Sequence, residues 1–314
     1  MMGIDYSSKM PDLIFRYDED FYTDDLPDPQ VNPVLPGARV PINKVGIAPV
    51  DLPIIVARRD GESQVLQAQA SLYCSLDDPN AKGLNLSRLY LIMHDTIENQ
   101  VTVSGIQYAL KELAEKQGSK NAYCKLKFKY PWTQEALRSK DDSGHKLHGH
   151  IAYNCEIEGI YSKGLYKFFL TVDYVYSSTC PCSFELAYDA RTKRDAAANA
   201  HSQRSIMKIK MEFDPDNVVW IEDVVELCRE HIPTEVQIVV KRRDEQAFAE
   251  LNGSNLLFSE DVCRIMYEAL DNWFHKEKIF DFSIVVEHYE SLHPWQAIAV
   301  TSKFNPNEVP GCLR

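Results

Sequence analysis

The order in which apolar patterns follow one another is the strongest constraint on the fold of this chain. In the first half, two segments of alternating apolar residues precede two segments with apolar residues at helical spacing, and two more alternating segments follow. The second half repeats this order without strong sequence identity to the first. Alternation is typical of half-buried strands, and helical spacing is typical of amphipathic helices. We therefore predict an α+β fold in which the order strand-strand-helix-helix-strand-strand occurs twice.

The predicted elements can be placed along the sequence. Strands are expected at residues 42–58, 64–78, 121–130, 148–160, 164–178, 203–214, 235–242, 279–289 and 296–303. Helices are expected at 86–98, 103–117, 220–230 and 260–275, and 191–200 is expected to be a loop or short helix. A division near residue 163 gives a first module at 41–162 and a second at 163–314, with the metal site discussed below in the second. Residues 1–40, rich in Asp, Pro and Tyr, are predicted to be an extended arm.

Composition excludes several classes of protein. The chain has 46 acidic and 34 basic residues, and its net charge of −12 argues against nucleic-acid binding. No apolar run reaches the roughly 20 residues of a membrane helix, and the N-terminus lacks the pattern of a secretory signal. Eight cysteines in 314 residues are too sparse for a disulfide scaffold. We expect a cytoplasmic protein that binds neither nucleic acid nor membranes.

Two thiols and an imidazole form the clearest chemical motif. Cys180 and Cys182 flank Pro181, and His201 follows at the start of the sequence His-Ser-Gln-Arg-Ser. Zinc binds thiolate and imidazole well, and no second cysteine cluster completes a closed four-thiolate cage. Together with one carboxylate, these ligands would leave a coordination position for water, which is the catalytic arrangement. The spacing alone does not separate this hypothesis from two buried structural cysteines and a loop histidine.

Basic side chains are expected in rows on three segments. Alternation places Lys125, Lys127 and Lys129 on one strand face, and Lys208 and Lys210 on another. A third basic cluster, at residues 241–243, stands at the end of a predicted strand. Each row alone is typical of a solvated face. Together, in an acidic chain, the rows favour a focused site for an anion such as a triphosphate.

A series of short motifs, in the right order, resembles those of the type IB GTP cyclohydrolases of the tunnelling-fold (T-fold) superfamily. They are Arg39–Gly46, Leu86–Arg88, Cys180–Ser183, His201–Ser205, Lys241–Glu245, Phe258–Asp261 and Tyr289–His293. The resemblance implies two tandem T-fold modules, antiparallel sheets with helix pairs on one face, which assemble into barrels in an oligomer, with a homotetramer as the expected form. It also implies a metal-dependent hydrolase that opens the guanine imidazole ring of GTP at C8, releases formate and gives 7,8-dihydroneopterin triphosphate for tetrahydrofolate biosynthesis.

The resemblance also implies a metal centre. Cys180 and His201 would bind the metal, with Glu245 as a carboxylate ligand. Zinc suits the thiolate and imidazole best, and the carboxylate would also admit manganese or iron. Cys182 would lie beside the metal or bind it transiently. The alternatives for these residues are a buried thiol, a loop histidine and a surface charge.

The remaining implied roles concern the substrate. Glu260 would accept hydrogen bonds from the ring N–H and the exocyclic amine of guanine together, although an acidic residue in the first turn of a helix is common without any ligand. His293 would transfer protons near the purine, with Glu290 as its support, and the alternative for His293 is a structural histidine. Further contacts to the nucleotide would come from Arg88, Lys127, Arg204, Ser205 and Lys208.

Two positions depart from the family pattern. Asn85 and Trp295 stand where the family has histidines. Neither side chain can transfer protons in the required range, although an indole can stack on a base. A divergent enzyme of the same superfamily that acts on another purine nucleotide, or stops at a ring-opened product, therefore stays open as an alternative. The other alternative is a non-catalytic T-fold protein that binds a purine or pterin.

Overall fold

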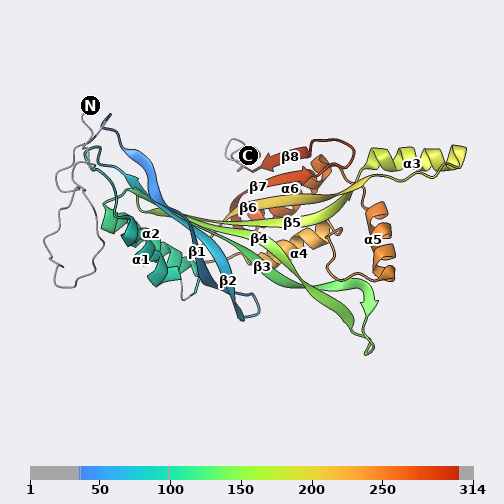
Figure 1. Ribbon diagram of the computed structural model, residues 1–314, viewed down its shortest axis with the longest axis horizontal. Coiled ribbons are helices and arrows are strands. Elements are labelled where there is room, and N and C mark those ends of the chain that lie inside the picture. Colours follow the sequence, from blue (N-terminus) through green and yellow to red (C-terminus); the bar gives the residue numbers. More distant parts are fainter. Residues whose placement is uncertain (1–34, 36, 98–99, 304–314) are drawn as a thin grey trace, which may run out of the picture.

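Eight antiparallel strands form one sheet in which each strand hydrogen-bonds to the next strand along the chain (Figure 1). The computed structural model describes residues 35, 37–97 and 100–303. The strands are β1 (Ile42–Ala57), β2 (Ser63–Leu76), β3 (Asn121–Lys140), β4 (Lys146–Ser162), β5 (Leu165–Thr179), β6 (Ser202–Phe213), β7 (Ile279–His288) and β8 (Ala297–Ser302). The α+β class predicted from the sequence is confirmed.

Two pairs of helices, α1 with α2 and α4 with α6, cover the sheet. The helices are α1 (Leu86–Ile97), α2 (Val103–Gln117), α3 (Pro181–Arg194), α4 (Ile221–His231), α5 (Arg242–Ser254) and α6 (Ser259–His275). The pair α1 and α2 packs against β1 to β4, whereas α4 packs against β5 and α6 against β7 and β8. Figure 1 shows α3 and α5 at the opposite end of the molecule from α1 and α2. No helix in the described part of the chain has both the length and the hydrophobicity of a membrane span.

Each strand buries alternate side chains, as the sequence pattern predicts. On β6, Met207, Ile209 and Met211 are completely buried, and burying a side chain of this size contributes about 1.5–3 kcal/mol. Between them, Lys208 and Lys210 point to the other side of the sheet. We call the side that carries these lysines the polar face.

The two halves of the sheet meet at a tight turn. Ser162 pairs with Leu165, and the two residues between them, Lys163 (φ 51°) and Gly164 (φ 88°), adopt left-handed backbone conformations. Such conformations suit the short turns that join antiparallel strands. The predicted division at this point therefore coincides with a hairpin turn, and the sheet continues through it.

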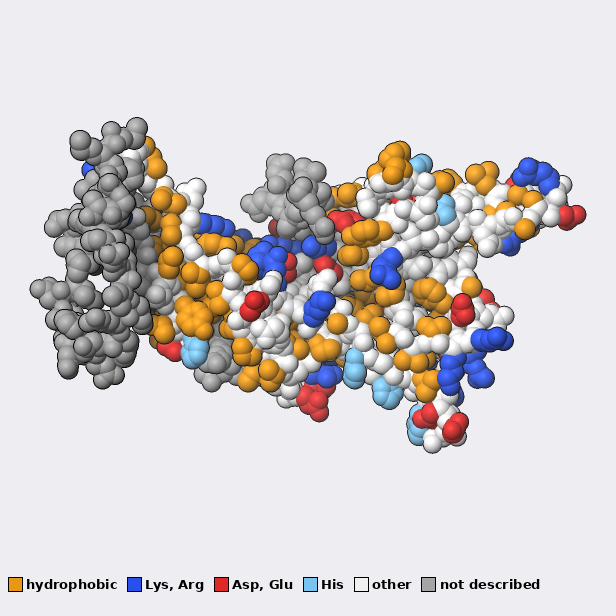
Figure 2. All heavy atoms as spheres, in the orientation of Figure 1, with side chains coloured by type: hydrophobic (Ala, Val, Ile, Leu, Met, Phe, Trp, Pro, Cys, Tyr) orange, Lys and Arg blue, Asp and Glu red, His pale blue; other side chains and the backbone are white. Residues whose placement is uncertain are grey.

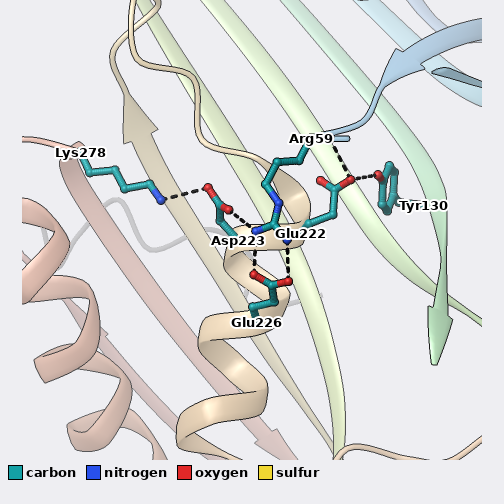
Figure 3. Close-up of polar contacts among 6 residues, drawn as sticks. All are labelled: Arg59, Tyr130, Glu222, Asp223, Glu226 and Lys278. Carbon is teal, nitrogen blue, oxygen red and sulfur yellow. Dashed lines mark hydrogen bonds and ion pairs between the residues drawn. The ribbon is translucent and has the colours of Figure 1, made fainter. Parts of the chain in front are cut away.

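A cluster of polar contacts also ties the first half to α4 (Figure 3). The guanidinium of Arg59, in the β1–β2 turn, lies 2.8 Å from Asp223 Oδ1 and 2.6 and 2.7 Å from the two carboxylate oxygens of Glu226. The hydroxyl of Tyr130 on β3 donates to Glu222 Oε1 at 2.5 Å, and the Arg59 backbone N–H donates to the same oxygen at 3.3 Å. The start of α4 is thereby held against β1 and β3.

Some predicted elements differ from the structure. The strand predicted at 235–242 is wrong, because Glu235 forms only an isolated bridge to Tyr176 and α5 begins at Arg242. The carboxylate of Glu235 is buried and hydrogen-bonded to Tyr153 at 2.5 Å, while Val240 is 50% exposed. A segment that buries a polar side chain and exposes an apolar one has the reverse of the expected pattern.

Other differences concern the extent of elements. Strands β3 and β4 are both longer than predicted. Strand β3 continues through Pro131, which pairs with Ala152 on β4. Helices α3 and α5 are additional, so the second half is more elaborate than the first. Most of the predicted arm, residues 1–34 and 36, lies outside the described residues.

Candidate metal and substrate site

Cys180 and His201 lie next to each other where β5 ends and β6 begins. Thr179 and Ser202 are partners in the antiparallel ladder, so the residue after one meets the residue before the other. The backbone N–H of Cys180 donates to the carbonyl oxygen of His201 at 3.2 Å. Cys180 occupies the N-cap position of α3 without a side-chain capping bond, and Pro181 takes the first helical position, where a missing N–H leaves no bond unmade. The fold thus brings together two residues that are separated by the whole of α3.

Among the described residues, two polar side chains contact the imidazole of His201, both at Nδ1. Gln203 Oε1 lies 2.9 Å from Nδ1, and Glu290 Oε2 lies 3.8 Å from it. Gln203 Nε2 donates to Ser178 Oγ at 2.7 Å, and Ser178 Oγ lies 2.8 Å from Ser205 Oγ. Because these contacts fall on Nδ1, Nε2 is the ring nitrogen that can bind a metal ion.

A second histidine, His288, lies at the same end of the sheet and is buried. His288 is 3% exposed, and its Nε2 lies 2.8 Å from the hydroxyl of Tyr176. Burial lowers the pKa of His288 from 6.5 to about 4, and the nearby carboxylate of Glu260 acts in the opposite direction. Glu260 is exposed in the first turn of α6. A backbone bridge between Thr179 and Leu256 brings the start of α6, which carries this predicted guanine anchor, to the same end of the sheet.

Glu245 lies on α5 and lines a cavity of about 590 Å³, whose lining includes residues next to Cys180 and His201 in the sequence. Thr179, Ser202 and Glu245 all line this cavity. Within residues 37–97 and 100–303, no group of three or more His, Cys, Asp and Glu side chains is arranged to hold one metal ion. The donor chemistry of Cys180 and His201 fits zinc, and Glu245, the predicted carboxylate ligand, would have to move in to complete the site.

The lysine rows on the polar face lie among carboxylates. Lys127 Nζ lies 3.1 Å from Glu156 Oε1, and Lys208 Nζ lies 3.7 Å from Asp173 Oδ1. Although burial acts to raise the pKa of Glu156, Lys125 and Lys127 lower it below its ordinary value. Four lysines of these rows are therefore paired with carboxylates of the same chain: Lys125, Lys127, Lys208 and Lys210. The third basic cluster is exposed, and Figure 2 shows Lys and Arg side chains gathered over the start of α5.

Three other predicted site residues lie on exposed positions. Cys182 is exposed in the first turn of α3, and His293 is exposed in the loop after β7. The ring of His293 stacks on Trp295, with centroids 4.8 Å apart and planes 8° from parallel. Arg88 is exposed on α1, where its guanidinium donates to the carbonyl oxygen of Lys116 at 3.2 Å. Helix α1 stands at the other end of the sheet from α3 (Figure 1), so Arg88 is remote from Cys180 within one chain.

Most of the predicted site residues nevertheless gather at one end of the sheet. They are Cys180, Cys182, His201, Arg204, Ser205, Glu245, Glu260 and Glu290. Arg204 is exposed on β6, and its carbonyl oxygen accepts from the Tyr289 backbone N–H at 3.2 Å, which holds the segment carrying Glu290 against β6. Glu290 lies beside His201, whereas the resemblance implied that it supports His293.

Sequence reasoning missed the buried polar residues at this end. They are Tyr176, Ser178, Gln203 and His288. Their positions in the alternating pattern could have identified two of them, because Ser178 and Gln203 fall where the other residues of the same strand face are mostly apolar and buried. A polar side chain at such a position is unfavourable unless it is hydrogen-bonded, so its presence points to a local role.

The family model described as "Type I GTP cyclohydrolase folE2" matches residues 26–299. The chain belongs to this family. The FolE2 protein of Dinoroseobacter shibae, named GTP cyclohydrolase FolE2, is 38% identical over 305 residues, which cover 94% of this chain and 80% of the relative. The FolE2 protein of Paracoccus denitrificans is also 38% identical, over 93% of this chain and 90% of the relative. Among solved structures, the uricase of Arthrobacter globiformis aligns with 87% of this chain and 96% of its own, at 10% identity and a TM-score of 0.47.

Proposed function

We propose that this protein is a GTP cyclohydrolase that hydrolyses the guanine ring of GTP at C8, releases formate and forms 7,8-dihydroneopterin triphosphate. The observation that carries the proposal is the match to the FolE2 family over residues 26–299. The adjacency of Cys180 and His201 supports it, because a thiolate and an imidazole together suit a catalytic metal site.

Cys180 and His201 would hold the metal, with Glu245 closing on it from α5. Zinc is the ion that this donor set favours, and manganese or iron are alternatives. A bound ion of this kind activates water for attack on a ring carbon. Cys180 would bind the ion through its sulfur from the N-cap position of α3. Cys182, in the first turn of the same helix, would contact the site from its exposed side.

Glu260 would fix the base. Its two carboxylate oxygens can accept from the ring N–H and the exocyclic amine of guanine together, which selects guanine over adenine. His293 would exchange protons with the purine, and the stacked indole of Trp295 would shield that imidazole on one side. Arg204 would complete the pocket from β6, and the exposed cluster at 241–243 offers positive charge for the triphosphate. Ser205 is completely buried, with its hydroxyl 2.8 Å from Ser178 Oγ, so it would support the site without touching the nucleotide.

A homotetramer would account for the residues that one chain keeps apart. Within the described residues β1 and β8 are the outer strands of the sheet, and unpaired outer strands favour pairing with another chain. Barrels formed in this way would let Arg88, and the lysines on the polar face, approach the Cys180 end of a second copy. The free cysteines of the described part of the chain suit a reducing compartment, so we place the enzyme in the cytoplasm.

The test is product analysis after incubation of the purified protein with GTP and zinc or manganese. Formate together with a pterin that fluoresces after oxidation supports the proposal. Formate without pterin would favour a ring-opened product, turnover of a different purine nucleotide would favour a divergent enzyme, and tight GTP binding without turnover would favour a binding protein.

A further inference from the structure

A buried row of hydrogen bonds ends on the ring of His201. Gln203 bridges His201 Nδ1, 2.9 Å from its Oε1, and Ser178 Oγ, 2.7 Å from its Nε2. Ser178 Oγ continues to Ser205 Oγ at 2.8 Å, and the side chains of these last three residues are at least nine-tenths buried. They replace the apolar side chains that occupy the same face of β5 and β6 elsewhere. Burying such groups is favourable only when their hydrogen bonds are satisfied, and here each one is.

The neighbours of His201 Nδ1 determine which ring nitrogen carries the proton. The amide Nε2 of Gln203 faces Ser178, so its oxygen faces the imidazole, and an amide oxygen can only accept. Glu290 Oε2 lies 3.8 Å from the same ring nitrogen, and a carboxylate favours a proton on the atom nearest to it. Both neighbours therefore hold the proton on Nδ1 and leave the lone pair on Nε2.

We propose that Gln203 is a positioning residue for the metal centre, which locks His201 in the tautomer that presents Nε2 to the ion. The inference rests on the proposed function, because the metal is what Nε2 would bind. Hydrogen-bond partners of this kind orient the histidine and increase its basicity as a ligand. Glu290 would assist by its negative charge near the same ring nitrogen, Nδ1.

Three variants separate positioning from packing. Gln203→Leu keeps the approximate volume and removes the acceptor for Nδ1–H. Gln203→Glu keeps an acceptor there, while Ser178 can donate to the new carboxylate. Gln134→Leu is the matched control, because Gln134 is also buried and its amide donates to Glu235 Oε2 at 2.7 Å, a contact that involves neither His201 nor Ser178.

The first measurement is zinc affinity of the metal-free protein, by competition with a chromogenic chelator. We expect Gln203→Leu to weaken zinc binding about 10–100-fold, and Gln203→Glu to recover most of the loss. Gln134→Leu should lower thermal stability without changing zinc affinity. Wild-type zinc affinity in a folded Gln203→Leu protein would overturn the proposal, as would an equal loss in the Gln134 control.

The second measurement does not need the metal. Nitrogen-15 NMR of histidine-labelled, metal-free protein reports which nitrogen of His201 is protonated. We expect Nδ1–H in the wild type and a mixture of tautomers in Gln203→Leu. A wild-type proton on Nε2 would overturn the proposal even if zinc binds, whereas a wild type that carries Nδ1–H but takes up no metal would count against the proposed function alone. If Gln203→Leu does not fold, Ser178→Ala, which frees the amide to rotate, should shift the tautomer in the same direction, and an unchanged tautomer there would overturn the proposal.

Discussion

The backbone N–H of Cys180 and the carbonyl oxygen of His201 are joined by a 3.2 Å hydrogen bond. The contact belongs to the main chain, so the two residues stay adjacent whatever their side chains are. It extends the ladder in which Thr179 pairs with Ser202. The candidate metal site is therefore positioned by the sheet, and its ligands can be changed one at a time without removing the structure that places them.

Removal of either ligand should abolish metal binding and leave the fold intact. We expect Cys180→Ala and His201→Ala to retain no zinc after dialysis and to melt like the metal-free wild type. Elemental analysis and thermal unfolding of the same samples measure both quantities. Cys155→Ala, which removes a thiol buried on β4, is the control and should keep wild-type zinc. Full zinc content in Cys180→Ala would contradict the ligand assignment.

Replacement of Glu260 by Gln should weaken selection for guanine. Loss of one charged acceptor lowers kcat/KM for GTP roughly 10²-fold, and the preference for GTP over ITP, which lacks the exocyclic amine, should fall with it. Steady-state kinetics with both nucleotides measures this, and zinc content should not change. Glu268→Gln, on an exposed position of the same helix, is the matched control. An unchanged GTP-to-ITP ratio in Glu260→Gln would show that the base is held elsewhere.

Stability should fall as the pH falls from about 6.5 to about 4, in part because of His288. Burial lowers its folded pKa to about 4 from 6.5, so in this window the unfolded chain takes up a proton that the folded chain does not. The contribution of the neutral His288 to the free energy of unfolding is complete above pH 6.5. Between pH 6.5 and about 4 it declines by up to about 1.4 kcal/mol per pH unit. Urea unfolding at several pH values measures it. His288→Gln should have a shallower slope than the wild type, and parallel slopes would contradict a neutral buried imidazole.

The contact between Tyr130 and Glu222 should stabilise the junction between the two halves. Tyr130→Phe removes the hydroxyl that donates to Glu222 Oε1 at 2.5 Å. Because a buried carboxylate then lacks a hydrogen-bond donor, the free energy of unfolding should fall by about 1–3 kcal/mol. Tyr108→Phe, at an exposed tyrosine, should change stability by less than about 0.5 kcal/mol.

A double-mutant cycle isolates that contact. Once Glu222 is Leu, the additional change Tyr130→Phe should cost much less, because no carboxylate remains to be satisfied. Urea unfolding of the four proteins gives the coupling energy. Additive losses would mean that the hydroxyl and the carboxylate do not interact.

The sequence predicted those parts of the fold in which local pattern and tertiary burial agree. Asparagine favours the N-cap position of helices, and the Asn85 side chain accepts from the Arg88 backbone N–H at 3.1 Å at the start of the first predicted helix. The alternation in β6 likewise matches its buried face. Helix α3 escaped prediction because it projects from the sheet and carries exposed apolar residues such as Leu186, so it lacks a buried apolar stripe.

The candidate site was predictable only in part. The Cys-Pro-Cys and His-Ser-Gln-Arg-Ser motifs identify the residues, but only the pairing of β5 with β6 brings them together. That Glu290 approaches His201, and that the lysines on the polar face meet Glu156 and Asp173, depends on contacts between distant segments. Residue identity and spacing do not determine such contacts.

The central claim is that a metal centre built on Cys180 and His201 opens the guanine ring at C8. The most direct test is carbon-13 NMR of GTP labelled at C8, incubated with zinc-loaded wild type and with His201→Ala. We predict that the wild type converts the label to formate and produces an unlabelled pterin, while the folded variant leaves the label in GTP. Release of labelled formate by His201→Ala at the wild-type rate, or a wild type that leaves C8 untouched, would contradict the account.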